Sequence, residues 1–336
     1  MRFLASFPHA SWDWYHYRAR KVIEGVIEGS NEVFKGESKG KVVLFESKDN
    51  IKDTEVLEII NTPQCYGLEY VAGEGLYVTM GQSCAEDCDI SKEKVIRINE
   101  SGHKDLEISL PVFSHLHSVK RTNNGLLITS SGIDAIFEIG LDGSIIWDWW
   151  AVEQGYNILK NGEERVIERD VDHRTRSYPT MFQTTHVNQA IEDPHLEDKI
   201  LAILYHQNSI IRIDKKTKRH EVVMEGLKRP HHLCGREEGY MFTNTRESKV
   251  ILTDIDFSSM EKFGGRLSEY ILSNWVQDTV FTPRGTYLLS DEGNFRFIET
   301  DGIKRHNVFE YGKPDRMFEI LIVPDDYRIG YNGDPL

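Results

Sequence analysis

The chain has 336 residues, of which 39% are hydrophobic and 28% are charged, a composition typical of a globular protein that can bury a sizeable core. Its net charge of -14 predicts an acidic surface that repels nucleic-acid phosphates and anionic lipid head groups, so we expect neither as a partner. Residues 1–21 lack the apolar core of a secretory signal, and no stretch approaches the roughly 20 apolar residues that span a bilayer. These features favour a cytoplasmic protein.

The four cysteines also agree with a reducing compartment. Cys84 and Cys88 are the only close pair, and their spacing fits half of a structural zinc site only loosely because no second half follows. Without a signal for export, we expect reduced thiols rather than disulfides.

Short apolar runs rich in β-branched and aromatic residues recur along the whole chain. Most are bounded by Gly, Asn, Asp or Lys, which is the pattern of strands joined by tight turns, and long helical periodicity is scarce. We therefore expect an all-β protein. In chain order these runs are KVVLFES, EVLEIIN, GLYVTM, KVIRINE, GLLITSS, AIFEIG, SIIWDWW, KILAIL, SIIRID, YMFTNT, KVILTD, TYLLSD, FRFIET, NVFEY and MFEILIV.

An internal repeat organises these runs. Each copy has a polar or aromatic position, a short strand, a Gly-containing turn and a second strand, and two further strands follow, as in DAIFEIGLDGSIIWDWW. Four strands per repeat describe one blade of a β-propeller. Successive copies lie about 45 to 51 residues apart, with one interval of about 69. The copies begin with CYGLEYVAGEGLYVT, LHSVKRTNNGLLITS, THVNQA, RPHHLCGREEGYMFT and WVQDTVFTPRGTYLLS.

A further blade can be completed by joining the ends of the chain. The run at 317–323 has no complete set of strands after it, whereas the runs at 41–47 and 55–61 precede the first repeat. Pairing them would hide two sheet edges that otherwise favour aggregation. We predict a single propeller domain over residues 1–336 with six blades, five blades being the alternative.

The long interval contains an insertion at about 151–183. It is too long and too charged for an ordinary connection, and long loops in compact domains are often lids over a site. Arg174 and Arg176 of this insertion are candidates for binding a substrate.

Aligning the repeats places one column of residues at equivalent positions. In a propeller the first strand of each blade lines the central channel, so this column should form a ring around one axis. Three of its five members are histidines, which predicts a convergent functional cluster rather than isolated buried histidines. His115, two residues before the column, should lie on the same strand face and is a further candidate for binding a substrate. The column consists of Tyr66, His117, His186, His231 and Gln277.

Two chemistries fit convergent imidazoles, and the spacing does not separate them. His117, His186 and His231 could hold a divalent metal ion such as Mn, Fe, Ni or Zn, with Gln277 adding an oxygen ligand. Alternatively, one imidazole could act as nucleophile while others serve as acids, bases or anion binders. No motif indicates a nucleotide cofactor.

The stretch RPHHLCG raises a separate question, since His231 and His232 are adjacent. On a regular strand His232 and Asp278, each one residue after the column, should point away from the axis. A β-bulge would let both neighbours face inward.

The runs THVNQAIEDPHLEDKILAILYHQNSIIRIDKKT at 185–217 and HSVKRTNNGLLITSSGIDAIFEIGLDGSIIWDWW at 117–150 resemble the arylsulfotransferase type of propeller. The resemblance covers roughly 100 residues. It implies six blades and transfer of a sulfuryl group from an aryl sulfate to a phenol through a covalent histidine intermediate. His117 and His186 would match the histidines that stabilise the anion, and His231 or His232 the nucleophile.

One departure weakens the reaction that this resemblance implies. Where the family has an anion-binding arginine, this chain has His206, between Tyr205 and Gln207, and an imidazole lacks the fixed fork of a guanidinium. The additional imidazole favours metal binding, as in propeller lyases that hold a divalent ion with histidines.

Our leading hypothesis is a metal-dependent lyase or hydrolase that acts on a small or medium anionic or aromatic substrate. Sulfuryl transfer is one alternative, and a non-enzymatic platform that binds a protein through its acidic rim is another. The sequence leaves the oligomeric state open.

Overall fold

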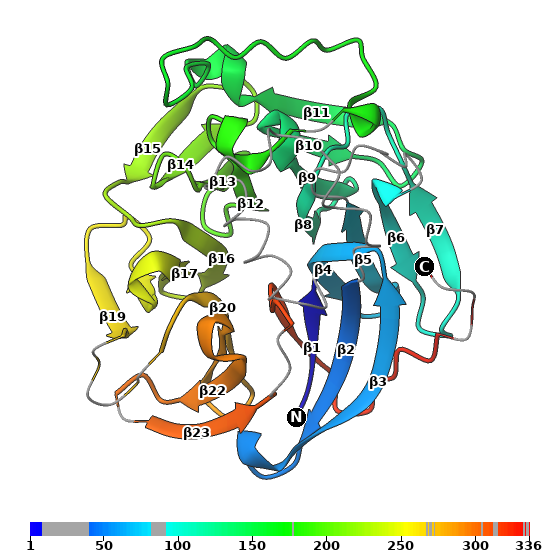
Figure 1. Cartoon of the computed structure of the whole chain (residues 1–336), viewed down its shortest axis with the longest axis vertical. Helices are drawn as coiled ribbons and strands as arrows, with labels where there is room; N and C mark the ends of the chain where they lie inside the picture. Colours follow the sequence, from blue (N-terminus) through cyan, green and yellow to red (C-terminus); the bar gives the residue numbers. More distant parts are fainter. Residues whose placement is uncertain are drawn as a thin grey trace, which may run out of the picture.

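The structure is a computed structural model that describes residues 1–8, 40–81, 92–176, 178–266, 268, 271, 273–303, 305–311, 315–331, 333 and 336. The possible zinc half-site at Cys84 and Cys88 lies outside these residues. Six four-stranded antiparallel sheets stand around a central axis (Figure 1). The predicted six-bladed propeller is confirmed, and the five-bladed alternative is wrong.

The blades are numbered here by the position of their inner strand along the chain. The inner strands contact one another in succession around the axis, as a propeller requires. From inner to outer strand, blade 1 is β4 (Gln64–Val71), β5 (Gly75–Gly81), β6 (Lys94–Ile98) and β7 (Lys104–Ile108); blade 2 is β8 (Leu116–Arg121), β9 (Leu126–Ser130), β10 (Ala135–Ile139) and β11 (Ile145–Trp150); blade 3 is β12 (Val187–Glu192), β13 (Lys199–Leu204), β14 (Ser209–Asp214) and β15 (His220–Met224).

The second half of the ring repeats this arrangement. Blade 4 is β16 (Pro230–Arg236), β17 (Gly239–Asn244), β18 (Lys249–Thr253) and β19 (Met260–Gly264); blade 5 is β20 (Val276–Phe281), β21 (Tyr287–Asp291), β22 (Arg296–Thr300) and β23 (Arg305–Glu310); blade 6 is β24 (Ile320–Val323), β1 (Arg2–Phe7), β2 (Gly40–Ser47) and β3 (Thr54–Thr62).

The hydrophobic core lies between neighbouring blades rather than inside any one of them. Between blades 2 and 3, for example, Leu127 and Trp149 pack against Ala190 and Ile200, all four being buried. Both faces of the middle strands are therefore covered, which explains why the sequence shows short continuous apolar runs there. This packing fixes the inner strands around the channel.

Blade 6 joins the two ends of the chain with the three strands that the sequence predicted and with one further strand, β1. The C-terminal strand β24 is the inner strand, and β1 pairs with both β24 and β2. Because RFLASF begins at the second residue, the repeat pattern did not reveal β1. This strand lies between the C-terminal strand and β2 and completes a four-stranded sheet.

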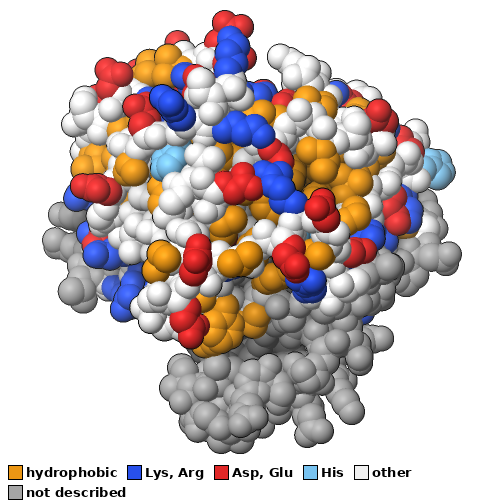
Figure 2. All heavy atoms as spheres, turned by 90° about the horizontal axis from the view of Figure 1, so that it is seen from above, with side chains coloured by type: hydrophobic (Ala, Val, Ile, Leu, Met, Phe, Trp, Pro, Cys, Tyr) orange, Lys and Arg blue, Asp and Glu red, His pale blue; other side chains and the backbone are white. Residues whose placement is uncertain are grey.

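The predicted insertion after β11 carries three short 3-10 helices, η5 (Ala151–Gln154), η6 (His173–Thr175) and η7 (Thr180–Phe182). Arg165 within it forms a buried ion pair with Asp134 of blade 2. Figure 2 views the side of the molecule where this insertion lies, and acidic and basic side chains are interspersed on it. Ion pairs such as Arg169 with Glu153 contribute to this mixture.

The part of the chain that the structure describes contains no helix long and apolar enough to cross a membrane.

Candidate functional site

β-bulges shape the inner strands around the channel. In β8 the pairing with β9 shifts between Leu116 and Ser118, and β12, β16 and β20 shift at or next to the matching position. A bulge inserts one extra residue, so two consecutive side chains can face the same way. Four blades therefore contribute neighbouring pairs to one cavity that is partly open to solvent, and Phe318 and Glu319, just before β24, add a fifth pair. Its lining is His117 and Ser118, Asn188 and Gln189, His231 and His232, Gln277 and Asp278, and Phe318 and Glu319.

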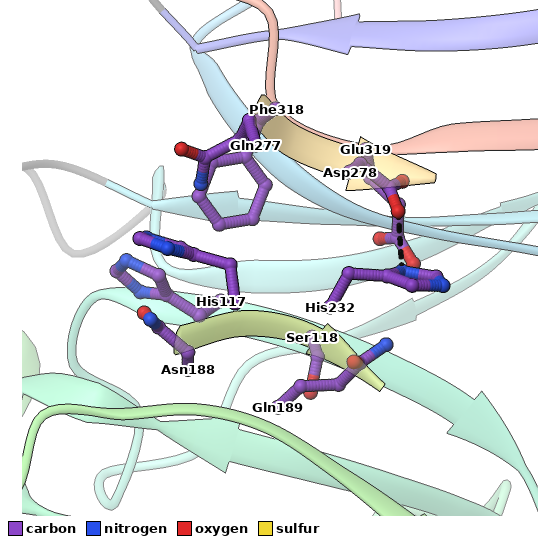
Figure 3. A pocket seen from close by; sticks show the side chains of 10 residues that line it. His117, Ser118, Asn188, Gln189, His232, Gln277, Asp278, Phe318 and Glu319 are labelled. Carbon is purple, nitrogen blue, oxygen red and sulfur yellow. Dashed lines mark ion pairs between the residues drawn. The ribbon is translucent and has the colours of Figure 1, made fainter. Parts of the chain in front are cut away.

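This lining answers the question raised by RPHHLCG. His231 and His232 both line the cavity. Gln277 and Asp278 line it too, and Figure 3 shows them with His232. β16 and β20 are therefore bulged at these positions rather than regular.

The register predicted for His186 is wrong by two residues. In four blades the residue just before the inner strand has a positive φ: His115 (55°), His186 (47°), Arg229 (53°) and Trp275 (58°). His186 therefore matches His115, and Asn188 is the member of blade 3 that matches His117. The mistake arose because alignment by residue type matched one histidine to another and overlooked the left-handed turn before each strand.

Despite this shift, three imidazoles do converge. The ligand atoms of His115, His117 and His186 all lie within 4.8 Å of one another, and all three residues are buried. Ring centroids are 4.2 Å apart for His115 and His117, and 4.6 Å apart for His117 and His186. This group of three histidines differs from the predicted metal ligands: it includes His115 and does not include His231.

Hydrogen bonds set the tautomers of these rings. Nδ1 of His117 lies 3.0 Å from the carbonyl oxygen of His115, and Nδ1 of His186 contacts the side-chain oxygen of Gln183. Nδ1 of His231 lies 3.1 Å from the carbonyl oxygen of Arg229 and 2.9 Å from the hydroxyl oxygen of Thr245, which can accept from the same N–H. A carbonyl only accepts, so each Nδ1 carries the proton and each Nε2 keeps its lone pair. Metal-binding histidines are oriented in this way.

Burial keeps the cluster uncharged. Desolvation lowers the pKa of His117 to about 3, and it holds the pKa of His186 and His231 well below the ordinary value. Repulsion from other imidazoles adds to the shift at His186, and repulsion from Arg316 adds to it at His117 and His231. Neutral imidazoles at pH 7 are the form that binds metals or attacks electrophiles.

The backbone of His186 is held by Asp134, which is itself in the left-handed region with φ 54°. Oδ1 of Asp134 accepts from the backbone nitrogen of His186 at 2.6 Å and from that of Thr185 at 3.0 Å. Oδ2 accepts from Thr184 and pairs with Arg165 of the insertion. A matching hydrogen bond occurs in blade 3, where the side-chain oxygen of Asn208 accepts from the backbone nitrogen of Arg229. Asp134 thus positions His186 and fastens the insertion beside it.

Two charged pairs lie across the cavity from His117 (Figure 3). Nδ1 of His232 is 2.6 Å from Oδ1 of Asp278. Burial opposes charge on His232, but Asp278 outweighs it and raises the pKa of His232 to about 10. Lys120 bonds Glu319 at 2.8 Å. Each buried charge therefore has a partner of opposite sign.

The remaining predicted site residues lie around the cavity rather than in it. Tyr66 stacks on His117 with centroids 4.6 Å apart, and its hydroxyl is 3.2 Å from Nε2 of His115. His206 donates from Nε2 to the carbonyl oxygen of Thr180 at 2.8 Å, and its ring lies 5.6 Å from that of His186.

The two arginines predicted to bind substrate are paired elsewhere. Arg174 bonds Asp172 at 2.6 Å, and Arg176 bonds Glu168 at 2.8 Å. Neither lines the cavity.

Gln277 lines the cavity, but its side-chain oxygen already accepts from the indole nitrogen of Trp275 at 3.1 Å. The amide nitrogen that remains is not a metal ligand, so the geometry does not favour Gln277 as an oxygen ligand.

Sequence reasoning missed several residues of the site. Asn188 was missed because the predicted register placed His186 at its position. Phe318 and Glu319 were missed because they belong to the blade whose strands come from both ends of the chain. Arg316 lies two residues before Phe318, with its guanidinium 6.0 Å from that ring and Nε 3.3 Å from Glu292. Aligning RMFEILIV with the five repeats would have placed Phe318 in the axial column.

Comparisons with known proteins support the fold alone. No family model and no curated protein matches the chain. A chain of a nidogen–laminin complex superposes with a TM-score of 0.57 at 11% identity, covering 95% of this chain and 97% of that one. A protein of unknown function from Bacteroides caccae gives the same values. A proposed 6-phosphogluconolactonase from Bacteroides uniformis gives 0.53 at 13% identity, covering 96% and 99%. All three resemble this chain in architecture.

Proposed function

We propose that the protein is an enzyme whose channel holds a divalent first-row metal ion on His115, His117 and His186. The observation that carries this proposal is the convergence of three buried imidazoles whose ligand atoms lie within 4.8 Å of one another. The donor set fits Zn, Fe, Ni or Mn, since neutral imidazoles suit these ions and three ligands leave coordination positions for substrate or water. The Nδ1 bonds of His117 and His186 provide the orientation that such ligands need.

The chemistry best matched to this site is that of a lyase or hydrolase. A bound ion would polarise a substrate oxygen or lower the pKa of a water molecule. His231, neutral and with its lone pair on Nε2, can accept a proton in the cavity. His232, kept charged by Asp278, can donate one. A base and an acid on one cavity can remove a proton from one atom and protonate the leaving group.

Elemental analysis of protein purified without a histidine tag tests the proposal. We expect about one Zn, Fe, Ni or Mn per chain in the wild type and loss of the metal in His117→Ala and His186→Ala. His103→Ala, on the exposed turn between β6 and β7, is the matched control and should keep the metal. Wild-type protein that stays free of metal after incubation with all four ions would contradict the proposal.

A second candidate is sulfuryl transfer, favoured by the surroundings of His231. Its Nε2 would attack the sulfur of an aryl sulfate, forming an N–S bond while the S–O bond to the phenolate breaks. An acceptor phenol would then attack sulfur, release the imidazole and lose its proton to it. Arg316, close enough to lower the pKa of His231 and His117, supplies the cation near the sulfonyl oxygens that His206 does not.

The first candidate function requires a bound metal ion, whereas sulfuryl transfer requires His231 as nucleophile and no metal. Release of phenolate from a phenyl sulfate by metal-free wild-type protein, abolished in His231→Ala, would establish sulfuryl transfer and remove the need for the metal. Absence of that release together with stoichiometric metal would exclude it.

A further inference from the structure

The cavity displays buried polar atoms that nothing in the described part of the chain satisfies. They are Oδ1 of Asn188, Nε2 of Gln277 and Nε2 of His232. The three residues come from three different blades and line the same cavity. A buried polar group without a partner costs about 1–3 kcal/mol, so three around one cavity point to a ligand that completes them.

The side-chain amides of Asn188 and Gln277 each make one hydrogen bond within the protein, and that bond determines which atom remains for a ligand. Nδ2 of Asn188 lies 3.0 Å from the carbonyl oxygen of Pro230, which only accepts, so the atom left for a ligand is the acceptor Oδ1. At Gln277 the partner is the indole nitrogen of Trp275, which only donates. The atom left there is the donor Nε2. Asn188 and Gln277 are therefore complementary to a group that both donates and accepts, as a hydroxyl does.

His232 offers a different contact. Its Nδ1 is bonded to the Asp278 carboxylate, and this ion pair keeps the ring charged, so Nε2 is also a donor. The carboxylates beside it are already engaged. Asp278 accepts from the backbone nitrogens of Thr279 and Ile320, and Glu319 accepts from Lys120 and the backbone nitrogen of Leu68. The remaining polar contact on this side is a charged donor, which suits an anionic oxygen.

Figure 3 shows the His232 ring on the side of the cavity opposite the ends of the Asn188 and Gln277 side chains, with the aromatic ring of Phe318 beside Gln277. A ligand that meets all three atoms must therefore carry its two polar groups apart, joined by a short apolar part. The enclosed part of the pocket is small and the rest opens to solvent, so we expect a short ligand, one end of which can extend toward solvent.

We infer that the channel binds a short hydroxycarboxylate, with its carboxylate at His232 and its hydroxyl between Asn188 and Gln277, beside His117. This inference rests on the proposed function, because it names the substrate class of the same channel. His232 pairs with Asp278, and Lys120 pairs with both Glu319 and Glu69, so these groups carry no surplus positive charge; the ligand carboxylate would be balanced by a cation held at the histidine cluster. The hydroxyl would lie at the metal, where its oxygen can be polarised.

Calorimetric titration with three probes of similar size tests this inference. 3-Hydroxybutyrate has both polar groups, butyrate lacks the hydroxyl and 2-butanol lacks the carboxylate. We expect metal-loaded wild-type protein to bind 3-hydroxybutyrate at least tenfold more tightly than either partial probe. Equal affinity for butyrate and 3-hydroxybutyrate, or binding of none of the three, would overturn the inference.

Single substitutions test which residue contacts which group of the ligand. Asn188→Leu and Gln277→Leu should remove the preference for 3-hydroxybutyrate over butyrate, whereas His232→Gln should weaken both acids by tenfold or more. Asn124→Leu, in the turn between β8 and β9, is the control and should bind like the wild type, and melting temperatures show which variants fold. Unchanged binding in folded Gln277→Leu and His232→Gln would overturn the inference.

Metal content measured on the same samples separates this inference from the proposed function. A metal-loaded protein that binds no hydroxycarboxylate contradicts the inference alone. A metal-free protein that binds 3-hydroxybutyrate through Gln277 and His232 contradicts the metal site and leaves the ligand class standing.

Discussion

His232 of β16 and Asp278 of β20 form an ion pair across the boundary between blades 4 and 5, with 2.6 Å between Nδ1 and Oδ1. Both side chains are buried, at 9% and 1% exposure. The pair links two neighbouring blades at the channel wall, and Asp278 favours the charged form of His232 in a cavity that the neutral His117 and His231 also line. Substitution of either residue should therefore change both the stability of the protein and the chemistry of the cavity.

We expect Asp278→Asn to lower the free energy of unfolding by about 3–5 kcal/mol, because it leaves a buried imidazolium without its counter-charge. The pKa of His232 should fall from its raised value as desolvation is no longer opposed, which NMR titration of the ring measures. Urea denaturation of Asp278→Asn, His232→Gln and the double variant forms a cycle. Additive losses would mean that the two residues do not interact.

The opposite pKa shifts of His117 and His232 predict a stability that falls on both sides of neutrality. For His117 the unfolded ring binds a proton near pH 6.5 and the folded ring only near pH 3, so stability decreases as pH falls through this window. For His232 the folded pKa of about 10 exceeds the unfolded value, so its contribution is complete below pH 6.5 and is lost as pH rises toward 10.

Urea denaturation of EDTA-treated protein between pH 4 and pH 10 measures this dependence. Each histidine contributes at most about 1.4 kcal/mol per pH unit. His117→Gln should flatten the acid side and His232→Gln the alkaline side. Profiles that stay unchanged in both variants would contradict these shifts.

Asp134 should support metal binding without touching the metal. Asp134→Gly keeps the left-handed backbone but removes the bonds to His186, Thr185 and Arg165, so we expect a loss of about 3–5 kcal/mol and at least tenfold weaker metal binding. Asn208→Gly removes the matching bond in the next blade and should reduce stability by about 1–2 kcal/mol with metal affinity unchanged. Equal metal affinity in both variants would rule out this role.

The strand β1 should be essential for closure of the ring. Leu4 is fully buried between β24 and β2, so Leu4→Ala should cost about 2–5 kcal/mol. Leu196→Ala, at a position with 40% exposure, should change stability by less than about 0.5 kcal/mol. Similar melting temperatures for the two variants would show that the N-terminal strand contributes little.

Most of the fold could be predicted because each blade repeats its own local pattern. Strand runs, glycine turns and a period of about 45 to 51 residues are short-range features, and they predicted six blades and closure by the chain ends. The same pattern placed the C-terminal run in the closing blade, but it left open whether His232 faces the channel, because a bulge was only an alternative to a regular strand. The strand β1 was missed because it stands apart from any repeat.

The candidate site was predicted less completely, since it depends on register and on contacts across blades. His186 was expected on the strand and lies one residue before it, held by a carboxylate 52 positions away in the sequence. Nothing local distinguishes His115 from His231 as the third member of the cluster. The amide orientations of Asn188 and Gln277 depend on Pro230 and Trp275, which meet them only in the folded protein.

The sequence by itself determined that this protein is a closed ring of four-stranded sheets with histidines at its centre, because hydrophobic periodicity and turn residues act locally. Only the tertiary structure decided which imidazoles converge, which one is charged and which polar atoms await a ligand. These properties arise from burial and from partners on other blades, and neither is encoded in the spacing of residues along one strand.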